Sequence, residues 1–147
     1  MKQLIILIVL LTGALCNVSA QDRLHPTHIS ATKSDEIKSF ITQMYNNKLY
    51  EDYDFLQKHC SAKLLKKLQD AYPYDADGIA YATWLFRSGQ QDSKPGADDK
   101  TIMLEVKADG DWFVYTALDM GWKFTNKIKI TNKGDEVVIE DVCAVKE

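Results

Sequence analysis

The spacing of the apolar residues changes near residue 100, and this change limits the folds that the chain can adopt. Between residues 34 and 72, apolar side chains recur at the three- and four-residue intervals that line one face of a helix. Beyond residue 100 they alternate with polar ones, as in strands that bury one face. Helices followed by an antiparallel meander predict an α+β fold with N-terminal helices packed on a curved antiparallel sheet.

Three helices are expected in the first half of the chain. Ser34 is a favourable N-cap for the first, residues 50–59 form a second short helix, and Ser61 caps a third that Pro73 ends. The lysines of the third helix take its solvent side. The side chains expected to face the core are Ile37, Phe40, Ile41, Met44, Tyr45, Phe55, Leu56, Leu64, Leu65, Leu68 and Tyr72.

Four strands are expected in the second half, separated by turns at residues 108–111 and 132–135 and by the segment before Phe124. In the first strand, Ile102, Leu104 and Val106 share one face. The second, residues 112–118, is apolar on both faces, which predicts a central strand with Trp112 and Tyr115 on opposite sides. The phase of the last strand predicts a bulge near residues 140–141.

The N-terminus predicts export. Lys2 precedes an apolar run over residues 4–11 and then small residues that end at Ala20, the features of a secretory signal peptide. The run is shorter than the roughly 20 apolar residues that span a bilayer, so no membrane span is expected after cleavage. We therefore expect a signal peptide over residues 1–20, a leader over 21–33 and a single domain over 34–147, in a periplasmic or secreted protein.

Lipidation at Cys16 is the alternative reading of the N-terminus. A lipidated cysteine would sit near this position, but it is preceded by Leu15, where lipoprotein processing requires a small residue. Cleavage after Ala20 without lipidation is the reading that the residues favour.

Charge argues against a nucleic-acid partner. Removal of residues 1–20 leaves 17 basic and 21 acidic side chains, a net charge of about −4, and the basic residues are scattered rather than interleaved with aromatic ones. A small polar ligand, an envelope protein or a second copy in a homodimer remain as partners.

Three stretches together resemble a known family: "GDWFVYTA", the closing "VVIEDV", and the block "KLLKKL…YPYDAD…QQD". They are similar to small secreted bacterial domains of unknown function in the NTF2-like (cystatin-like) superfamily. The resemblance covers most of residues 34–144. It implies a cone of curved antiparallel sheet around a long helix, often with a cavity, and it implies no particular activity because that fold hosts many functions.

Residues 72–92, "YPYDADGIAYATWLFRSGQQD", concentrate aromatic rings and carboxylates in a stretch that is neither a regular helix nor a regular strand. One interpretation is that the rings fill the core and the polar residues form a corner. The other is the rim of a pocket for a sugar, a peptide or another small polar ligand. The candidate rim consists of Tyr74, Asp75, Asp77, Tyr81, Trp84, Gln91, Asp92 and Tyr115. The function that these features favour is a non-catalytic envelope module.

The alternative function is a small hydrolase or isomerase. In that case Asp75, Asp77 or Asp92 would act as the base in the mouth of the cone, with a tyrosine as oxyanion donor. The chain lacks a nucleophile elbow and a glycine-rich phosphate loop, so no catalytic residue and no cofactor are assigned. The "DADG" sequence does not fit a calcium loop in spacing, and no metal site is expected.

Two cysteines, Cys60 and Cys143, remain after signal cleavage. An even count in an oxidising compartment makes them a candidate disulfide. Free cysteine is also among the most buried residue types, so two unpaired thiols are the alternative.

Overall fold

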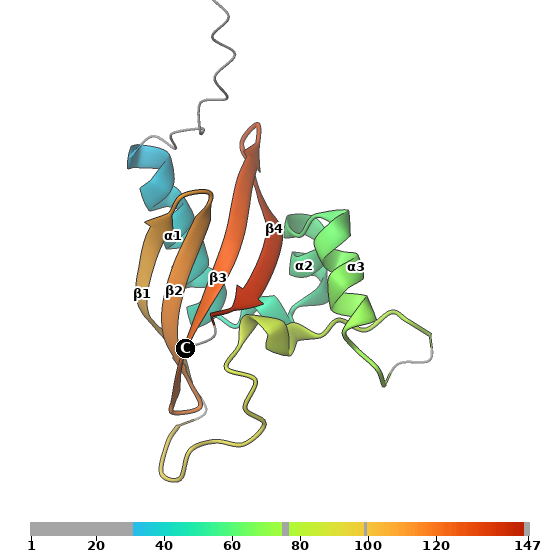
Figure 1. Ribbon diagram of the computed structural model, residues 1–147, viewed down its shortest axis with the longest axis vertical. Coiled ribbons are helices and arrows are strands. Elements are labelled where there is room, and N and C mark those ends of the chain that lie inside the picture. The colour runs from blue at the N-terminus through green and yellow to red at the C-terminus, as the bar shows by residue number, and fades with distance from the viewer. Residues whose placement is uncertain (1–30, 75–76, 99, 146–147) are drawn as a thin grey trace, which may run out of the picture.

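The computed structural model describes residues 31–74, 77–98 and 100–145 (Figure 1). The element order is α1 (Ala31–Asn46), η1 (Leu49–Glu51), α2 (Tyr53–His59), α3 (Ala62–Asp70), η2 (Thr83–Phe86), β1 (Thr101–Asp109), β2 (Trp112–Asp119), β3 (Trp122–Lys133) and β4 (Glu136–Ala144). The expected α+β fold, with helices that precede an antiparallel sheet, is confirmed.

The sheet is a four-stranded meander in the order β1-β2-β3-β4, with every neighbouring pair antiparallel. The expected turns at 108–111 and 132–135 join β1 to β2 and β3 to β4. Met120 and Gly121 form the turn between β2 and β3, and both have positive φ, as the tightest hairpin turns require. β2 is therefore an interior strand, as its apolar sequence predicts.

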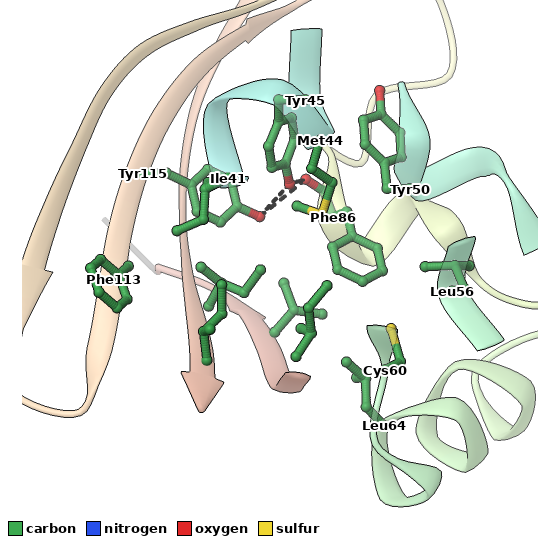
Figure 2. Close-up of a cluster of buried hydrophobic side chains, with 14 of the residues drawn as sticks. Ile41, Met44, Tyr45, Tyr50, Leu56, Cys60, Leu64, Phe86, Phe113 and Tyr115 are labelled. Carbon is green, nitrogen blue, oxygen red and sulfur yellow. Dashed lines mark hydrogen bonds between the residues drawn. The ribbon is translucent and has the colours of Figure 1, made fainter. Parts of the chain in front are cut away.

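The core lies between the helices and one face of the sheet (Figure 2). On β2, Phe113, Tyr115 and Ala117 are buried while Trp112 and Val114 on the opposite face are only half-buried. The predicted opposition of Trp112 and Tyr115 is confirmed, and the side that faces the core is that of Tyr115. Large fully buried side chains contributed by the helices include Ile37, Ile41, Met44, Tyr45, Tyr50, Leu56, Leu64, Leu68 and Phe86.

Both edges of the sheet meet helical segments. α1 packs along β1, and the Asn46 side chain accepts a hydrogen bond from the Met103 N–H at 3.0 Å. At the other edge, the junction of α2 and α3 lies beside β4: Ser61 N–H donates to the Ile139 carbonyl at 2.9 Å, and the Lys67 ammonium donates to the Val142 carbonyl at 2.7 Å. Such contacts occupy strand groups that would otherwise be open to pairing with another chain.

The helix boundaries differ from the prediction at the N-terminus. α1 begins at Ala31, so Ser34 lies inside the helix and is not its N-cap, and the last residues of the expected leader are helical. The second helix begins later than expected, at Tyr53, with the Asp52 carboxylate capping the N–H groups of Asp54 and Phe55. Ser61 does cap α3, by accepting from Leu64 N–H at 3.2 Å. None of the described helices is long and apolar enough to cross a membrane.

Two bulges set the phase of the outer strands. On β4 the register shifts next to Glu140, which confirms the predicted bulge. On β1 a shift between Met103 and Glu105 was not predicted. The expectation that Ile102, Leu104 and Val106 share a face is therefore wrong: Val106 packs against the core, whereas the other two are exposed.

The two faces of β2 predict different costs of truncation. Phe113→Ala removes a fully buried ring, so it should lower the free energy of unfolding by about 3–5 kcal/mol. Trp112→Ala should cost clearly less, because its ring is half-exposed on the other face. Urea unfolding of both variants beside the parent measures the difference. Equal midpoints for the two variants would contradict the assignment of the core face.

Candidate ligand-binding site

Three aromatic rings come together where α3 ends and η2 begins. The Tyr72 ring lies 5.2 Å from that of Trp84, centroid to centroid, and 6.2 Å from that of Tyr74, with the two tyrosine rings nearly perpendicular. Tyr74 is 86% exposed and Trp84 38%. We call these three residues the aromatic corner. Exposed rings held by contact with one another form a surface on which a flat apolar face of a ligand can stack.

Local structure places Trp84 at the surface and Phe86 in the core. A 3-10 helix turns about 120° per residue, so residues two apart point in different directions. Phe86 is fully buried, and Trp84 projects toward Tyr72. The segment before η2 is fixed by Ala82 N–H, which donates to the Leu68 carbonyl at 2.9 Å, and by Tyr81 N–H, which donates to the Tyr53 hydroxyl at 3.2 Å.

The carbonyl groups at the end of η2 are bound by side chains from three other elements. Carbonyls at a helix C-terminus have no partner within the helix and must find one elsewhere. The Phe86 carbonyl lies within hydrogen-bond distance of the hydroxyls of Tyr45 on α1 and Tyr115 on β2, which are also within hydrogen-bond distance of each other (Figure 2). The Asn126 amide on β3 donates to the carbonyls of Leu85 and Arg87, each at 3.3 Å.

An ion pair fixes the next two residues of the chain. The Arg87 guanidinium donates to both carboxylate oxygens of Asp119, from Nε at 3.0 Å and from Nη2 at 2.9 Å. Ser88 adds a hydroxyl hydrogen bond at 2.9 Å, and Asp119 is 0% exposed. Bidentate pairs of this kind fix geometry as well as charge. We call Tyr45, Arg87, Tyr115, Asp119 and Asn126 the η2 anchor.

The anchor perturbs the pKa values of its own groups. Burial raises the pKa of Asp119, but the hydrogen bonds from Arg87 and Ser88 and the guanidinium charge outweigh it, so the pKa falls below its usual value. Burial raises the pKa of Tyr45 and of Tyr115, and it raises that of the neighbouring Tyr50 to about 12. The phenols therefore stay neutral and the carboxylate stays ionised at ordinary pH.

The residues of the candidate rim are divided among three places. Tyr74 and Trp84 meet in the aromatic corner, whereas Tyr81 and Tyr115 are buried in the core. Asp77 is exposed near the corner in sequence, and Asp75 lies outside the described residues. Gln91 and Asp92 belong to the loop that follows the anchor.

That loop, described over residues 88–98, is bound to the turn between β2 and β3. Trp122 Nε1–H donates to the Asp92 carbonyl at 2.9 Å, and the Lys94 ammonium lies 5.7 Å from the centre of the Trp122 ring. Gly121 is required here, because its φ is +83° and an added Cβ would lie 2.4 Å from Cβ of Ala97. The loop is thus a second corner, supported separately from the aromatic one.

Sequence reasoning missed the anchor, although one signal was available. Asp119 continues the inward phase of Phe113 and Tyr115 on β2, and Asn126 continues that of Ile128 on β3. A polar side chain in the inward phase of a strand needs a buried partner. The identity of the partner, Arg87, could not be read from a segment without periodicity.

The two cysteines of the candidate disulfide are free thiols in the structure, with Cys60 buried and Cys143 exposed. Cys60 pairs with Ile139 of β4, and Cys143 is four residues further along that strand. At the rise of a strand this separates them by roughly 13 Å. A disulfide requires Cα atoms within about 7 Å, so the backbone would have to move to form it.

Comparison with known proteins assigns no role to these features. No protein-family model, curated protein or solved structure matches the chain significantly. Across the described residues, no group of three or more His, Cys, Asp or Glu side chains has the geometry to hold a metal ion. The site is therefore argued from the geometry of the aromatic corner and of its anchor.

Removing the Asp119 charge should destabilise the fold and change its pH dependence. Asp119→Asn leaves Arg87 without its buried partner, at a cost of about 3 kcal/mol near pH 7. The folded-state pKa of Asp119 is lowered, so the carboxylate contributes fully above its unfolded pKa of about 3.9. That contribution is lost as pH falls through the folded pKa, and parent and variant should then converge.

Urea unfolding at pH 7 and at successively lower pH measures this difference. Asp70→Asn is the matched control, because its pair with Lys66 is exposed at the end of α3 and should contribute little at any pH. A constant gap between parent and Asp119→Asn at all pH values would contradict the role given to the ion pair.

The thiols should differ in reactivity. Burial raises the pKa of Cys60 to about 12, so its thiolate is scarce, whereas Cys143 is exposed. Thiol titration of the native chain from residue 21 onward should detect one fast thiol, and unfolding without a reductant should release a second. An unfolded monomer with no reactive thiol would instead establish the bridge.

Proposed function

We propose that this chain is an exported, non-catalytic envelope module that binds a small polar ligand or a partner protein at the aromatic corner. The observation that carries the proposal is that the Tyr72 ring contacts the rings of both Tyr74 and Trp84. The side chains of Tyr74 and Trp84 are exposed. Exposed rings in contact favour a ligand that has both an apolar face and hydroxyl groups, as a sugar does.

The η2 anchor supports this proposal because it fixes the element that bears Trp84. Binding to flexible side chains loses affinity through the cost of ordering them. Trp84 stands two residues before Phe86, whose carbonyl is held by Tyr45 and Tyr115, and three before Arg87, which is paired with Asp119. The ring is thus positioned before a ligand arrives.

The alternative, a hydrolase or isomerase, finds less support. Such chemistry needs a carboxylate whose pKa is raised so that it can accept a proton near neutral pH. Within the described ranges, Asp119 is the one buried carboxylate; its pKa is lowered, and Arg87 and Ser88 occupy its oxygens. The ion pair between Arg87 and Asp119 therefore stabilises the fold and does not abstract a proton.

Membership of the NTF2-like superfamily is part of the proposal. It is supported by the order of elements, with helices before a four-stranded meander, and by the inward row of rings on β2 facing α1. Members of that fold often have a cavity between helix and sheet. In this chain the fully buried rings of Tyr45, Tyr50 and Phe86 lie between the helices and the sheet. The ligand site is accordingly proposed at the surface.

Ligand binding by the mature chain, residues 21–147, tests the proposal. Soluble oligosaccharides are titrated while tryptophan fluorescence is recorded, and co-sedimentation with insoluble envelope polysaccharide gives a second measure. Trp84→Ala should weaken binding about fivefold, because a ring contact contributes on the order of 1 kcal/mol. Tyr74→Ala should weaken it in the same direction.

Gln43→Ala is the control, since Gln43 is an exposed side chain on α1, away from the corner. It should leave affinity unchanged. Binding that is equal in the parent and in Trp84→Ala would refute the aromatic corner as the site. If no saccharide binds at millimolar concentration, the sugar form of the proposal is wrong.

A further inference from the structure

The face of the sheet that points away from the core carries an apolar stripe. Figure 1 shows α1 behind β1 and β2 with no helix in front of them. On this open face, Ile102 is 47% and Leu104 49% exposed. Half-buried side chains of β2 continue the stripe, and we call the whole set the outer stripe: Ile102, Leu104, Trp112, Val114 and Leu118.

The strand register makes the outer stripe continuous. Ile102 is the direct partner of Leu118, so the two side chains share a face. The bulge on β1 sets Leu104 and Glu105 against the single residue Thr116, which places Leu104 among the exposed side chains. Without the bulge, simple alternation from Ile102 would bring Leu104 and Val106 to this same face and leave the core without Val106.

The charges on the two sides of the stripe differ in sign. On the β3 side, Lys123, Lys127 and Lys129 are the direct partners of Leu118, Val114 and Trp112 and so share their face. On the β1 side, Glu105 and Asp109 are the partners of Thr116 and Trp112, with Lys107 between them. The face is therefore basic along β3 and acidic in net charge along β1, although Lys127 pairs with Asp109 at 2.8 Å and Lys107 with Glu105 at 2.9 Å within the chain.

We propose that this face binds a second copy of the chain, with a two-fold axis parallel to β2. Such an axis lays β1 of one protomer over β3 of its partner and stripe over stripe. Asp109 and Lys129 flank Trp112 at the same level of the sheet, so they would pair across the interface twice, with one oxygen of Asp109 also bound to Lys127 of its own chain at 2.8 Å. A two-fold contact has to be self-complementary, and this arrangement of charge satisfies that condition.

The size of the face fits a weak dimer. The three strands that overlap across this axis, β1, β2 and β3, lie about 4.8 Å apart, and over eight residues they cover roughly 380 Å² per protomer, or about 760 Å² in total. That is below the roughly 1,000 Å² of a stable specific interface and is the size of a transient contact. The Lys129 ammonium lies 3.9 Å from the Asp111 carboxylate in its own chain, so it can move to a better partner at little cost. We expect dissociation in the micromolar range.

Sedimentation equilibrium of the mature chain across micromolar concentrations tests the proposal. The parent should be in concentration-dependent equilibrium between monomer and dimer. Val114→Lys places a charge in the middle of the outer stripe and should weaken the dimer at least tenfold while its circular dichroism stays that of the parent. A parent that is monomeric at several hundred micromolar overturns the proposal, and so does a dimer that Val114→Lys leaves intact.

Complementary charge reversals test the predicted orientation. Lys129→Glu and Asp109→Lys should each be monomeric alone, because every homodimer would contain two like-charge contacts. Mixed in equal amounts, they should form a dimer, since both contacts then join opposite charges. Lys66→Glu, on the solvent side of α3, is the control and should dimerise as the parent does. A mixture that stays monomeric overturns the orientation, and with it the proposed interface.

Discussion

The rest of the structure depends on how the end of η2 is held. The last carbonyl groups of η2 and the side chain of Arg87, which follows it, are polar groups in the interior. Each needs a hydrogen-bond partner to offset the cost of leaving water. Partners come from Tyr45 of α1, Tyr115 and Asp119 of β2, and Asn126 of β3. One short segment therefore joins the first helix to the middle of the sheet, and all of these groups must be in place together.

The same requirement explains the positions of the other helices. A four-stranded sheet of this kind has two edges, which would pair with other chains if they were left open. α1 meets the β1 edge through Asn46, and the α2–α3 junction meets the β4 edge through Ser61 and Lys67. Since α3 is held against β4 and η2 against β2 and β3, Tyr72 and Trp84 come into contact from two separately anchored elements.

A structural feature of this chain can be predicted from the sequence when it depends on residues that are close together in the sequence. Alternation on β2, the glycine turns and the Ser61 cap depend on neighbouring residues, and they were predicted correctly. The bulge near Glu140 left a visible break in phase, whereas the one before Glu105 did not, because apolar residues on both sides of it keep an apparent alternation. Ser34 was a sound N-cap by residue type, yet the helix continues through it.

The candidate site was predicted less well for the same reason. Tyr74 and Trp84 both contact the Tyr72 ring, whereas Tyr81 and Tyr115, from the same candidate rim, are core residues. The pairing of Arg87 with Asp119 joins positions 32 residues apart, one of them in a segment without any period. Contacts between residues so far apart in the sequence form only when the whole chain has folded, and no local sequence pattern predicts them.

The two proposed surfaces are compatible in one molecule because β2 separates them. Its inward residues hold η2 and so fix Trp84, while its outward residues form the outer stripe. A dimer on the outer face would leave the aromatic corner of each protomer uncovered, since that corner lies beyond β4 at the ends of α3 and η2 (Figure 1). Two weak sites on one rigid dimer bind a repeating polymer more tightly than either does alone, because the second contact becomes intramolecular. A weak stacking surface and a weak dimer therefore reinforce each other where the ligand is a polysaccharide of the cell envelope.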